Sequence, residues 1–283
     1  NDGSIPTTAA TADVTITGET ASDNFGYALV TGDFNADGKI DLTAGAYGYG
    51  GQRGRLYIYT MNDNVVVGSA TSDYFGMALN AGDYNADGKT DLAVGAYGYS
   101  SSTGRVYIFY NGSVATTTSS ADIVITGNAT GDAFGYSLAT GDVNADGEAD
   151  LIVGAYAYST STGRAYIFYN GSIITEGASG ADVTITGNAT SDAFGISLAT
   201  GDLNADGEVD LVVGASGYSS NTGRAYIFHN DGSIPTTAAT ADVTITGNAT
   251  SDYFGTSLAT GDLNADGEVD LAVGADGYTT NTG

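Results

Sequence analysis

The stretch DAFGYSLATGDVNADGEADLIVGAYAYSTSTGRAYIF, residues 132–168, contains the pattern that decides the fold. It begins with Phe-Gly, continues through an acidic loop and a short apolar run ending in Gly-Ala, and closes with Gly-Arg-x-Tyr-Ile-Phe. Internal repetition at a near-constant period is the signature of a repeat architecture. The Phe-Gly pair recurs with spacings of 50, 59, 60 and 60 residues, at Phe25, Phe75, Phe134, Phe194 and Phe254. The chain therefore contains five copies of one structural unit.

Each unit has four short apolar or alternating stretches between turn-forming residues, which predicts four β-strands. In one unit these are residues 134–139, 151–155 and 165–169, with 123–126 just before it. Such units are typical of a β-propeller, whose blades cover one another and whose ring hides the strand edges. A string of separate domains is disfavoured, because about 60 residues without Cys make a marginal core. We predict one all-β domain over residues 1–283, a propeller of five four-stranded blades that start near residues 23, 73, 132, 192 and 252.

The two ends of the chain are out of phase with the blades. Residues 1–18 are identical to 230–247, so the chain begins with the outer strand of a unit, at 12–18. We expect this strand to complete the last blade, which stops where other units continue with Gly-Arg-x-Tyr-Ile-Phe. The third strand of that blade is missing. Three explanations stay open: a truncated sequence, an excerpt of a longer repeat array, or a strand supplied by a neighbouring molecule. The last predicts self-association end to end.

Composition excludes several classes of protein. The chain has 33 Asp and Glu against 7 Lys and Arg, a formal charge of −26, so we expect no nucleic-acid partner. It has no run of 18 apolar residues and no signal-peptide pattern at Asn1, so we expect no membrane insertion and no retained leader. It has no Cys, so neither a disulfide framework nor a thiolate metal site can form.

Each unit carries the acidic loop Asp-x-Asn-x-Asp-Gly-x-x-Asp. Oxygen ligands at loop positions 1, 3, 5 and 9, a carbonyl at position 7 and Gly at position 6 suit Ca²⁺. Mg²⁺ is less suited, because it requires a smaller octahedron and keeps its waters. An EF-hand is also disfavoured, because small or apolar residues such as Ala44 and Val94 replace the Glu at position 12. The predicted ligands are Asp33, Asn35, Asp37, Lys39 and Asp41; Asp83, Asn85, Asp87, Lys89 and Asp91; Asp142, Asn144, Asp146, Glu148 and Asp150; Asp202, Asn204, Asp206, Glu208 and Asp210; and Asp262, Asn264, Asp266, Glu268 and Asp270.

We therefore expect about five structural Ca²⁺ ions. At free Ca²⁺ about tenfold above Kd, each ion would stabilise the fold by about 1.4 kcal/mol, and five by about 7 kcal/mol. Asp, Asn and Gly as ordinary turn formers would explain one such loop but not five in register.

These motifs resemble the FG-GAP repeat, the blade of the integrin α-chain head and of related calcium-binding propellers. The resemblance covers essentially the whole chain. It implies blades of the FG-GAP type, calcium loops between the first two strands of each blade, and ligands bound on the opposite face. The family's Gly-Ala-Pro is replaced here by sequences such as Gly45-Ala46-Tyr47 and Gly214-Ala215-Ser216, and integrins have seven repeats rather than five.

The face away from the calcium loops is rich in Tyr with small polar neighbours, which suits sugar stacking or protein contact. The alternative is that some of these side chains only pack between blades. The candidates are Tyr47, Tyr49, Tyr97, Tyr99, Tyr156, Tyr158, Tyr218 and Tyr278.

Five Asn-x-Ser/Thr sequons indicate a glycosylated, extracellular protein, although chance competes in a chain this rich in Asn, Ser and Thr. They are at Asn111, Asn128, Asn170, Asn188 and Asn248.

The remaining charged residues predict structural roles. The arginines that open the third strands, such as Arg164, are expected to pair with the aspartates before Phe-Gly, such as Asp132. His229 replaces a Tyr of other units and is interpreted as packing. No unit gathers an acid, a base and a nucleophile, so a propeller lyase or hydrolase is disfavoured.

The sequence favours a non-enzymatic, extracellular or cell-surface, calcium-stabilised propeller that serves adhesion, surface structure or filament assembly, with a protein or glycan partner. The alternative is a lectin that binds carbohydrate at its Tyr-rich loops.

Overall fold

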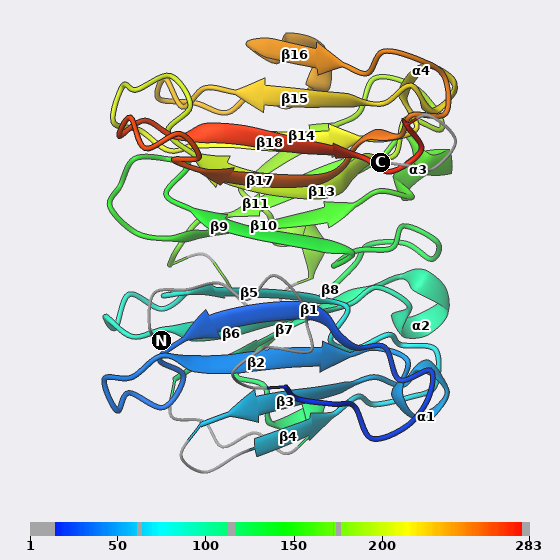
Figure 1. The fold of residues 1–283 in the computed structure, drawn as a ribbon, viewed down its shortest axis with the longest axis vertical. Coiled ribbons are helices and arrows are strands. Elements are labelled where there is room, and N and C mark those ends of the chain that lie inside the picture. Colours follow the sequence, from blue (N-terminus) through cyan, green and yellow to red (C-terminus); the bar gives the residue numbers. More distant parts are fainter. Residues whose placement is uncertain (1–14, 61–63, 112–116, 172, 174–176, 279–283) are drawn as a thin grey trace.

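The computed structural model describes residues 15–60, 64–111, 117–171, 173 and 177–278. Its fold is all-β, with five antiparallel sheets that follow the five sequence units (Figure 1). Four sheets have four strands in sequence order and the fifth has two. The strands are β1 (Phe25–Gly32), β2 (Asp41–Ala46), β3 (Arg55–Tyr59) and β4 (Asn64–Val67); β5 (Ala78–Gly82), β6 (Asp91–Ala96), β7 (Arg105–Phe109) and β8 (Ile123–Thr126); β9 (Ser137–Gly141), β10 (Asp150–Ala155), β11 (Arg164–Phe168) and β12 (Val183–Thr186); β13 (Phe194–Gly201), β14 (Asp210–Ala215), β15 (Arg224–Phe228) and β16 (Val243–Thr246); and β17 (Phe254–Gly261) and β18 (Asp270–Ala275).

The strand boundaries differ from the expected ones mainly at the Phe-Gly pair. In the third sheet, β9 begins at Ser137, three residues after Phe134. Gly135 has a φ of +84°, a left-handed conformation that Gly adopts at little cost and that interrupts regular pairing. In the first and fourth sheets the strand includes Phe-Gly, and the register shifts between Phe25 and Leu29 and between Phe194 and Leu198. Phe-Gly therefore forms an irregular entry to the first strand rather than part of its ladder.

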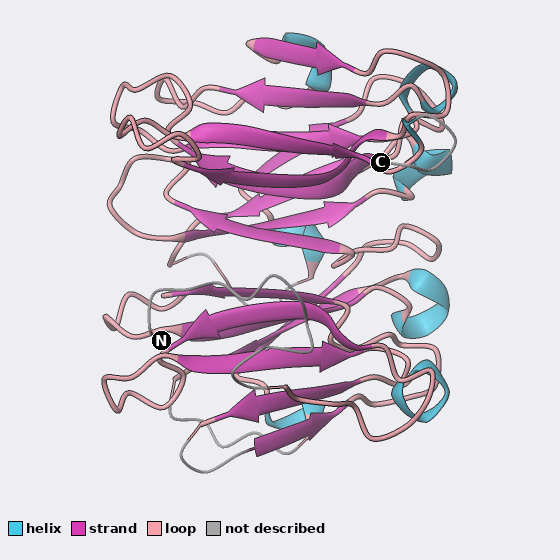
Figure 2. Ribbon diagram, viewed as in Figure 1, coloured by secondary structure: helices cyan, strands magenta, loops and turns pink. Residues whose placement is uncertain are grey.

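Short helical segments, which the sequence analysis did not predict, follow the second strand in each of the first four units. Each begins at a Tyr of the loop, and they lie at one end of the sheets (Figure 2). They are α1 (Tyr49–Gln52), α2 (Tyr99–Ser102), α3 (Tyr158–Ser161) and α4 (Tyr218–Asn221). Short 3-10 turns precede three of the fourth strands, at Thr118–Ser120, Ala178–Gly180 and Ala238–Thr240.

The sheets stack in sequence order, and the core lies between them. Two core clusters span neighbouring sheets: Ile125 of β8 lies in one cluster with Tyr166 and Phe168 of β11, and Ile185 of β12 in another with Tyr226 and Phe228 of β15. Burying such aliphatic and aromatic side chains is the main source of stability in a fold of this kind.

Polar contacts join the first strands of neighbouring sheets. The Thr200 hydroxyl donates to the Thr140 carbonyl at 2.6 Å, and Thr260 to Thr200 at 2.7 Å. Residues from β1, β5, β9, β13 and β17 all line one cavity of about 580 Å³, so the five sheets curve around a common axis. Closure of this arc into a ring is not shown by the packing of the described residues. The fold is thus five sheets of the predicted kind, and the propeller ring stays a prediction.

The fifth sheet has fewer strands than the others in the part of the chain that the structure describes. Among the described residues, only β17 and β18 belong to it. The strand expected at 12–18 lies partly outside the described residues, and Thr15–Gly18 form no strand. Completion of the last blade by the N-terminal strand therefore stays a prediction.

Candidate metal centres

The five acidic loops connect the first and second strands of each sheet, as the sequence predicted. They lie at the end of the sheets opposite the short helices (Figure 1). The first loop is representative. Its Ala36 and Gly38 have φ values of +55° and +81°, which turn the chain back on itself, and Gly at position 6 is left-handed in every loop.

Each loop is held by its own side-chain oxygens. In the first loop, Asp33 Oδ1 accepts from Asp37 N at 3.0 Å, and Asp33 Oδ2 accepts from Gly38 N at 2.8 Å. Asn35 Oδ1 also accepts from Asp37 N, at 2.9 Å, and Asp37 Oδ1 accepts from Lys39 N at 2.9 Å. The other four loops form the same four hydrogen bonds. The five loops thus share one conformation, in which the side-chain oxygens of positions 1, 3 and 5 accept hydrogen bonds from the loop's own backbone.

The aspartate at position 9 is buried beneath its loop. Asp91, Asp150 and Asp210 have no exposed surface, although each is a carboxyl group. Their Oδ2 atoms accept from the backbone N of position 2 at 2.9–3.0 Å. The pKa of Asp91 and of Asp150 is raised to about 6, chiefly by burial and also by the neighbouring loop aspartates, against the backbone hydrogen bonds that lower it. A carboxyl in this position gains from a nearby cation, because desolvation and like charge both oppose its ionisation.

The donor chemistry of the loops fits a hard cation. Three carboxylates, one amide oxygen and one backbone carbonyl per loop are the ligands that Ca²⁺ prefers. Among the described residues, no three His, Asp or Glu side chains converge as a metal cluster. In each loop, part of the predicted ligand set is Asn and backbone oxygen, and the carboxylates accept hydrogen bonds from the loop backbone. Calcium at the predicted ligands therefore stays a proposal, supported by chemistry rather than by a converged cluster.

One Asn after each of β7, β11 and β15 connects two neighbouring loops. Asn111 N donates to Asp91 Oδ1 at 2.8 Å, while Asn111 Nδ2 donates to the Asp33 carbonyl of the preceding loop at 2.6 Å. Asn170 joins Asp150 and Asp83 in the same way. Asn230 joins Asp210 and Asp142, the latter at 3.4 Å. The acidic loops are therefore mechanically linked from sheet to sheet, which the sequence analysis did not predict.

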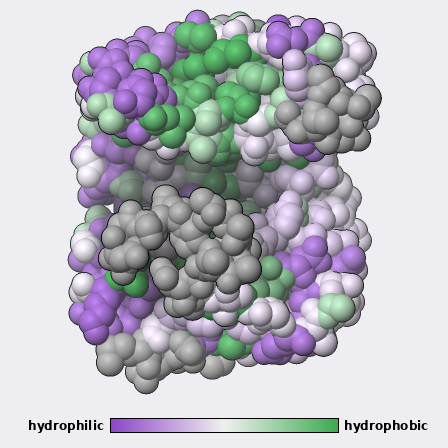
Figure 3. Space-filling model, viewed as in Figure 1, coloured by the Kyte–Doolittle hydropathy of each residue, from purple (hydrophilic) through white to green (hydrophobic). Residues whose placement is uncertain are grey.

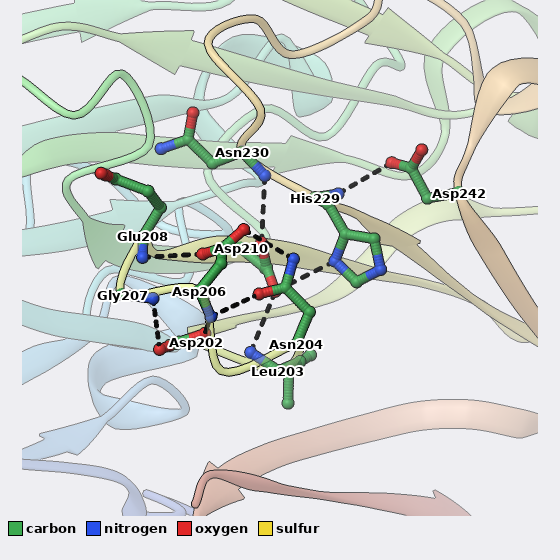
Figure 4. A network of polar contacts seen from close by, with 10 residues as sticks. All are labelled: Asp202, Leu203, Asn204, Asp206, Gly207, Glu208, Asp210, His229, Asn230 and Asp242. Carbon is green, nitrogen blue, oxygen red and sulfur yellow. Dashed lines mark hydrogen bonds and ion pairs between the residues drawn. The ribbon is translucent and has the colours of Figure 1, made fainter.

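His229 belongs to the same network in the fourth loop (Figure 4). Its Nδ1 lies 3.1 Å from Oδ2 of Asp210, and its backbone N donates to Asp242 Oδ2 at 2.8 Å. The sequence interpretation placed this side chain in the packing. It is instead a polar neighbour of a candidate ligand, and the signal for this was its position directly before the bridging Asn230.

The tyrosines of the opposite face form two sets. Tyr47, Tyr97 and Tyr156 join three further tyrosines in one continuous chain of aromatic contacts, with ring centroids 4.5–6.1 Å apart. Its members in order are Tyr27, Tyr47, Tyr74, Tyr97, Tyr136 and Tyr156. Burial raises the pKa of Tyr136 to about 12, so its hydroxyl stays protonated at neutral pH. Tyr27 and Tyr136 also line the axial cavity.

The second set packs against arginine. The guanidinium groups of Arg55, Arg105, Arg164 and Arg224 lie 3.5–3.8 Å from the ring centroids of Tyr49, Tyr99, Tyr158 and Tyr218. Such cation–π contacts contribute about 0.5–2 kcal/mol each. Arg105, Arg164 and Arg224 also donate through Nε to a Thr of the fourth strand at 2.9–3.0 Å. For these four tyrosines the packing interpretation therefore applies.

The expected direct pairs between these arginines and the aspartates before Phe-Gly do not form. The arginine charge lowers the pKa of Asp132 and Asp192, but burial outweighs it and the net shift is upward. Among the described residues, Arg55 forms an ion pair with Glu19, and His229 Nδ1 lies within hydrogen-bond distance of Asp210 Oδ2. The guanidinium groups stack on Tyr instead, and the Asp192 carboxylate accepts a hydrogen bond from Ala189 N at 3.1 Å.

The sequons divide by environment. The Nδ2 atoms of Asn111 and Asn170 carry the bridge between loops, so a glycan there would replace that hydrogen bond. The side chains of Asn128, Asn188 and Asn248 are exposed. Glycan occupancy stays a prediction.

Comparison with known proteins gives matches over much of the chain. The FG-GAP repeat family matches residues 25–59, 75–109, 134–168, 194–228 and 254–283. Integrin alpha-PS2 of Drosophila melanogaster is 38% identical over 168 residues, which cover 53% of this chain and 12% of that protein. Phosphatidylinositol-glycan-specific phospholipase D of Bos taurus is 31% identical over 159 residues, 50% of this chain and 18% of that protein.

Among solved structures, the V. cholerae biofilm matrix protein Bap1 aligns over 75% of this chain and 39% of its own chain, at 18% identity and a TM-score of 0.30. The alignments with the integrin and the phospholipase D cover less than a fifth of the length of either protein. In the part of the chain that the structure describes, no helix is long and apolar enough to cross a bilayer.

Proposed function

Because this chain belongs to the FG-GAP repeat family, we propose that it is a calcium-stabilised, non-enzymatic adhesion or surface module. The integrin alpha-PS2 relative supports an adhesion-related role. The phospholipase D relative carries the same repeats within an enzyme, and the aligned part is 18% of that protein. The repeats are therefore shared by proteins of different activity. We infer the role of the repeats from the feature that all five units share, the acidic loop.

The observation that carries the proposal is the identical conformation of five oxygen-lined loops, each above an inward-facing aspartate. We infer that each loop binds one Ca²⁺ through positions 1, 3, 5 and 9 and the carbonyl of position 7. The bound ion supplies the positive charge that the −26 chain lacks, which stabilises the hairpin between the first two strands. Asn111, Asn170 and Asn230 also join the first four loops, each to the next.

Native mass spectrometry and calcium titration calorimetry would test this proposal. We expect up to five ions per chain, and the variant Asp142→Ala should bind one fewer ion. Mg²⁺ at the same concentration should bind more weakly. The proposal would be wrong if the calcium-saturated chain carried no specifically bound ion and had the same melting temperature as the chelated chain.

A lectin is the second candidate, and the aromatic chain from Tyr27 to Tyr156 favours it. The six tyrosines offer apolar ring faces and hydroxyl groups, which sugars use together, and two of them, Tyr27 and Tyr136, line the axial cavity. Binding on a glycan array should be lost in Tyr97→Ala and Tyr156→Ala, and kept in Tyr99→Ala, whose ring packs against Arg105. A broad array without any specific binding would remove this candidate.

Location and assembly belong to the same proposal. An extracellular or cell-surface site would supply calcium at the concentrations that such loops need. Glycan occupancy at the exposed sequons Asn128, Asn188 and Asn248 would support that location, and mass spectrometry of the protein from its natural source would detect it. Self-association end to end, which bears on a role in filaments, is tested by light scattering with and without EGTA.

A further inference from the structure

The aromatic chain from Tyr27 to Tyr156 is a path of ring contacts across the first three sequence units. Each unit contributes one pair of tyrosines, and within each pair the ring centroids are 4.5–4.8 Å apart. Between successive pairs the centroids are 6.1 and 5.2 Å apart. Figure 3 shows pale residues of intermediate hydropathy midway along the end of the sheets that carries the short helices, at the right of the view. The pairs are Tyr27 with Tyr47, Tyr74 with Tyr97, and Tyr136 with Tyr156.

Tyrosine is the side chain of this protein that most readily loses one electron. The chain has 20 Tyr but no Cys and no Trp, the two side chains that otherwise compete for a one-electron oxidant. Met is present only twice, and it reacts mainly by gaining an oxygen at its sulfur. An oxidising equivalent that reaches the chain therefore ends on a tyrosine ring.

The middle pair differs from the other two in the way its rings face each other. The ring planes of Tyr74 and Tyr97 are 23° apart, so these rings are stacked. The rings of the outer pairs meet edge to face, at 82° and 63°. Stacking brings the π orbitals of the two ring faces into contact, and a carbon–carbon bond between two phenoxyl radicals requires that overlap. The middle pair is therefore the one arranged for coupling.

The surroundings hold both rings of this pair in place. A Cβ atom on Gly98 would lie 2.5 Å from Cδ2 of Tyr74, so the absence of a side chain there leaves the room that the ring occupies. The Tyr74 hydroxyl donates to Gln52 Oε1 at 3.0 Å. Burial, and then the neighbouring hydroxyls beginning with that of Tyr74, raise the pKa of Tyr97. Tyr97 thus stays a protonated phenol at neutral pH and loses its proton together with the electron.

We propose that Tyr74 and Tyr97 form a site of oxidative cross-linking, where a peroxidase-type one-electron oxidant and hydrogen peroxide join the two rings as dityrosine. Each phenol gives up one electron and its hydroxyl proton. The two radicals form one bond between the carbons next to their oxygens, and the hydrogen on each of these carbons moves to the oxygen of the same ring. In total, two electrons and two protons reduce one hydrogen peroxide to two water molecules.

Tyr27 is the entry to the path. It is 57% exposed, whereas the other five tyrosines of the aromatic chain are half-buried. A radical formed on Tyr27 takes an electron from Tyr47 and regains a proton from water, while Tyr47 loses its proton. The same exchange carries the radical on to Tyr74. This inference rests on ring geometry and does not depend on the proposed calcium binding.

Treatment of the full chain with a haem peroxidase and limiting hydrogen peroxide tests the proposal. We expect dityrosine fluorescence in the monomer and, after digestion, two peptides joined through Tyr74 and Tyr97, lighter by two hydrogen atoms than their sum. Tyr74→Phe and Tyr97→Phe keep the ring but lack the hydroxyl, so each should abolish this link. Tyr99→Phe is the matched control, because its ring packs against Arg105, and it should leave the yield unchanged.

Two further measurements separate the path from the cross-link. Tyr27→Phe should slow the formation of the link without moving it, and an unchanged rate would overturn the role of Tyr27 as the entry. The cross-linked monomer should melt at a higher temperature than the untreated chain, because the link restricts the unfolded state.

Three results would overturn the proposal. The first is a link that maps to other tyrosines in the monomer, and the second is dityrosine that forms only between molecules. The third is a chain without dityrosine in a mixture where added free tyrosine is coupled. Peptide mapping of the unsubstituted chain distinguishes these results without any variant.

Discussion

The fourth and fifth sheets have nearly the same sequence but different surroundings. Residues 197–211 are identical to 257–271, which includes the whole acidic loop. Leu211 is fully buried, whereas the equivalent Leu271 is only partly covered. Asp210 accepts a hydrogen bond from Asn230 at the end of the third strand, and the fifth sheet has no such strand among its described residues. One sequence thus gives one local conformation, while burial and support depend on the neighbouring strands.

Removal of calcium should give the largest effect and should separate the two sheets. With about 1.4 kcal/mol per site at tenfold saturation, chelation of all five ions would lower the free energy of unfolding by about 7 kcal/mol. The fifth loop, for which the described residues show no contact like that made by Asn230, should lose its ion first. Calorimetric melting across a series of free Ca²⁺ concentrations, with hydrogen exchange at β14 and β18, measures both effects. If β14 and β18 lost their protection from hydrogen exchange at the same free Ca²⁺ concentration, the predicted difference in calcium affinity between the two loops would be wrong.

A cavity in the core should have a smaller and also unequal effect. Phe194 is fully buried against Tyr226 and Phe228, whereas Phe254 is partly buried. Phe194→Ala should therefore cost about 3–5 kcal/mol, and Phe254→Ala less than half of that. Urea unfolding of the two variants in saturating calcium compares them directly. Equal losses would mean that the fifth sheet is as well covered as the fourth.

The same contrast explains how much could be predicted from the sequence. The five sheets and the acidic loops follow from short-range signals, such as Gly at loop position 6 and alternation in the third strands, so they were predicted. The contacts made by Asn111, Asn170 and His229 join residues far apart in the chain, and their sequence environment resembles that of any turn. The division of the tyrosines into an aromatic chain and a set stacked on arginine depends on where the first strands meet, which periodicity does not give. The irregular entry at Phe-Gly follows from a left-handed Gly135, which strand propensity alone does not reveal.

Acidity should change stability through the buried loop aspartates of the second and third sheets. Because burial raises the pKa of Asp91 and Asp150 to about 6, from an ordinary value near 3.8, protons bind the folded chain more tightly than the unfolded one. Their contribution is therefore fully present below about pH 3.8 and is lost as the pH rises through about 6. In calcium-depleted buffer the melting temperature at pH 5 should exceed that at pH 7.5 by about 5 °C.

Two controls define this pH effect. The double variant Asp91→Asn and Asp150→Asn, which cannot ionise, should show a flatter trend in calcium-depleted buffer. Saturating calcium should oppose the trend, because the ion binds the deprotonated carboxylates. A melting temperature that rises from pH 5 to pH 7.5 without calcium would show that these two groups do not dominate.

The smallest effect should come from the ring that supports each arginine, and here the two sheets should again differ. Tyr218→Ala removes the ring 3.7 Å from the guanidinium of Arg224 and should cost about 0.5–2 kcal/mol. Tyr278 follows β18 at the equivalent position and is 44% exposed, so Tyr278→Ala should change the free energy of unfolding by no more than about 0.5 kcal/mol. Urea unfolding of both variants measures the difference.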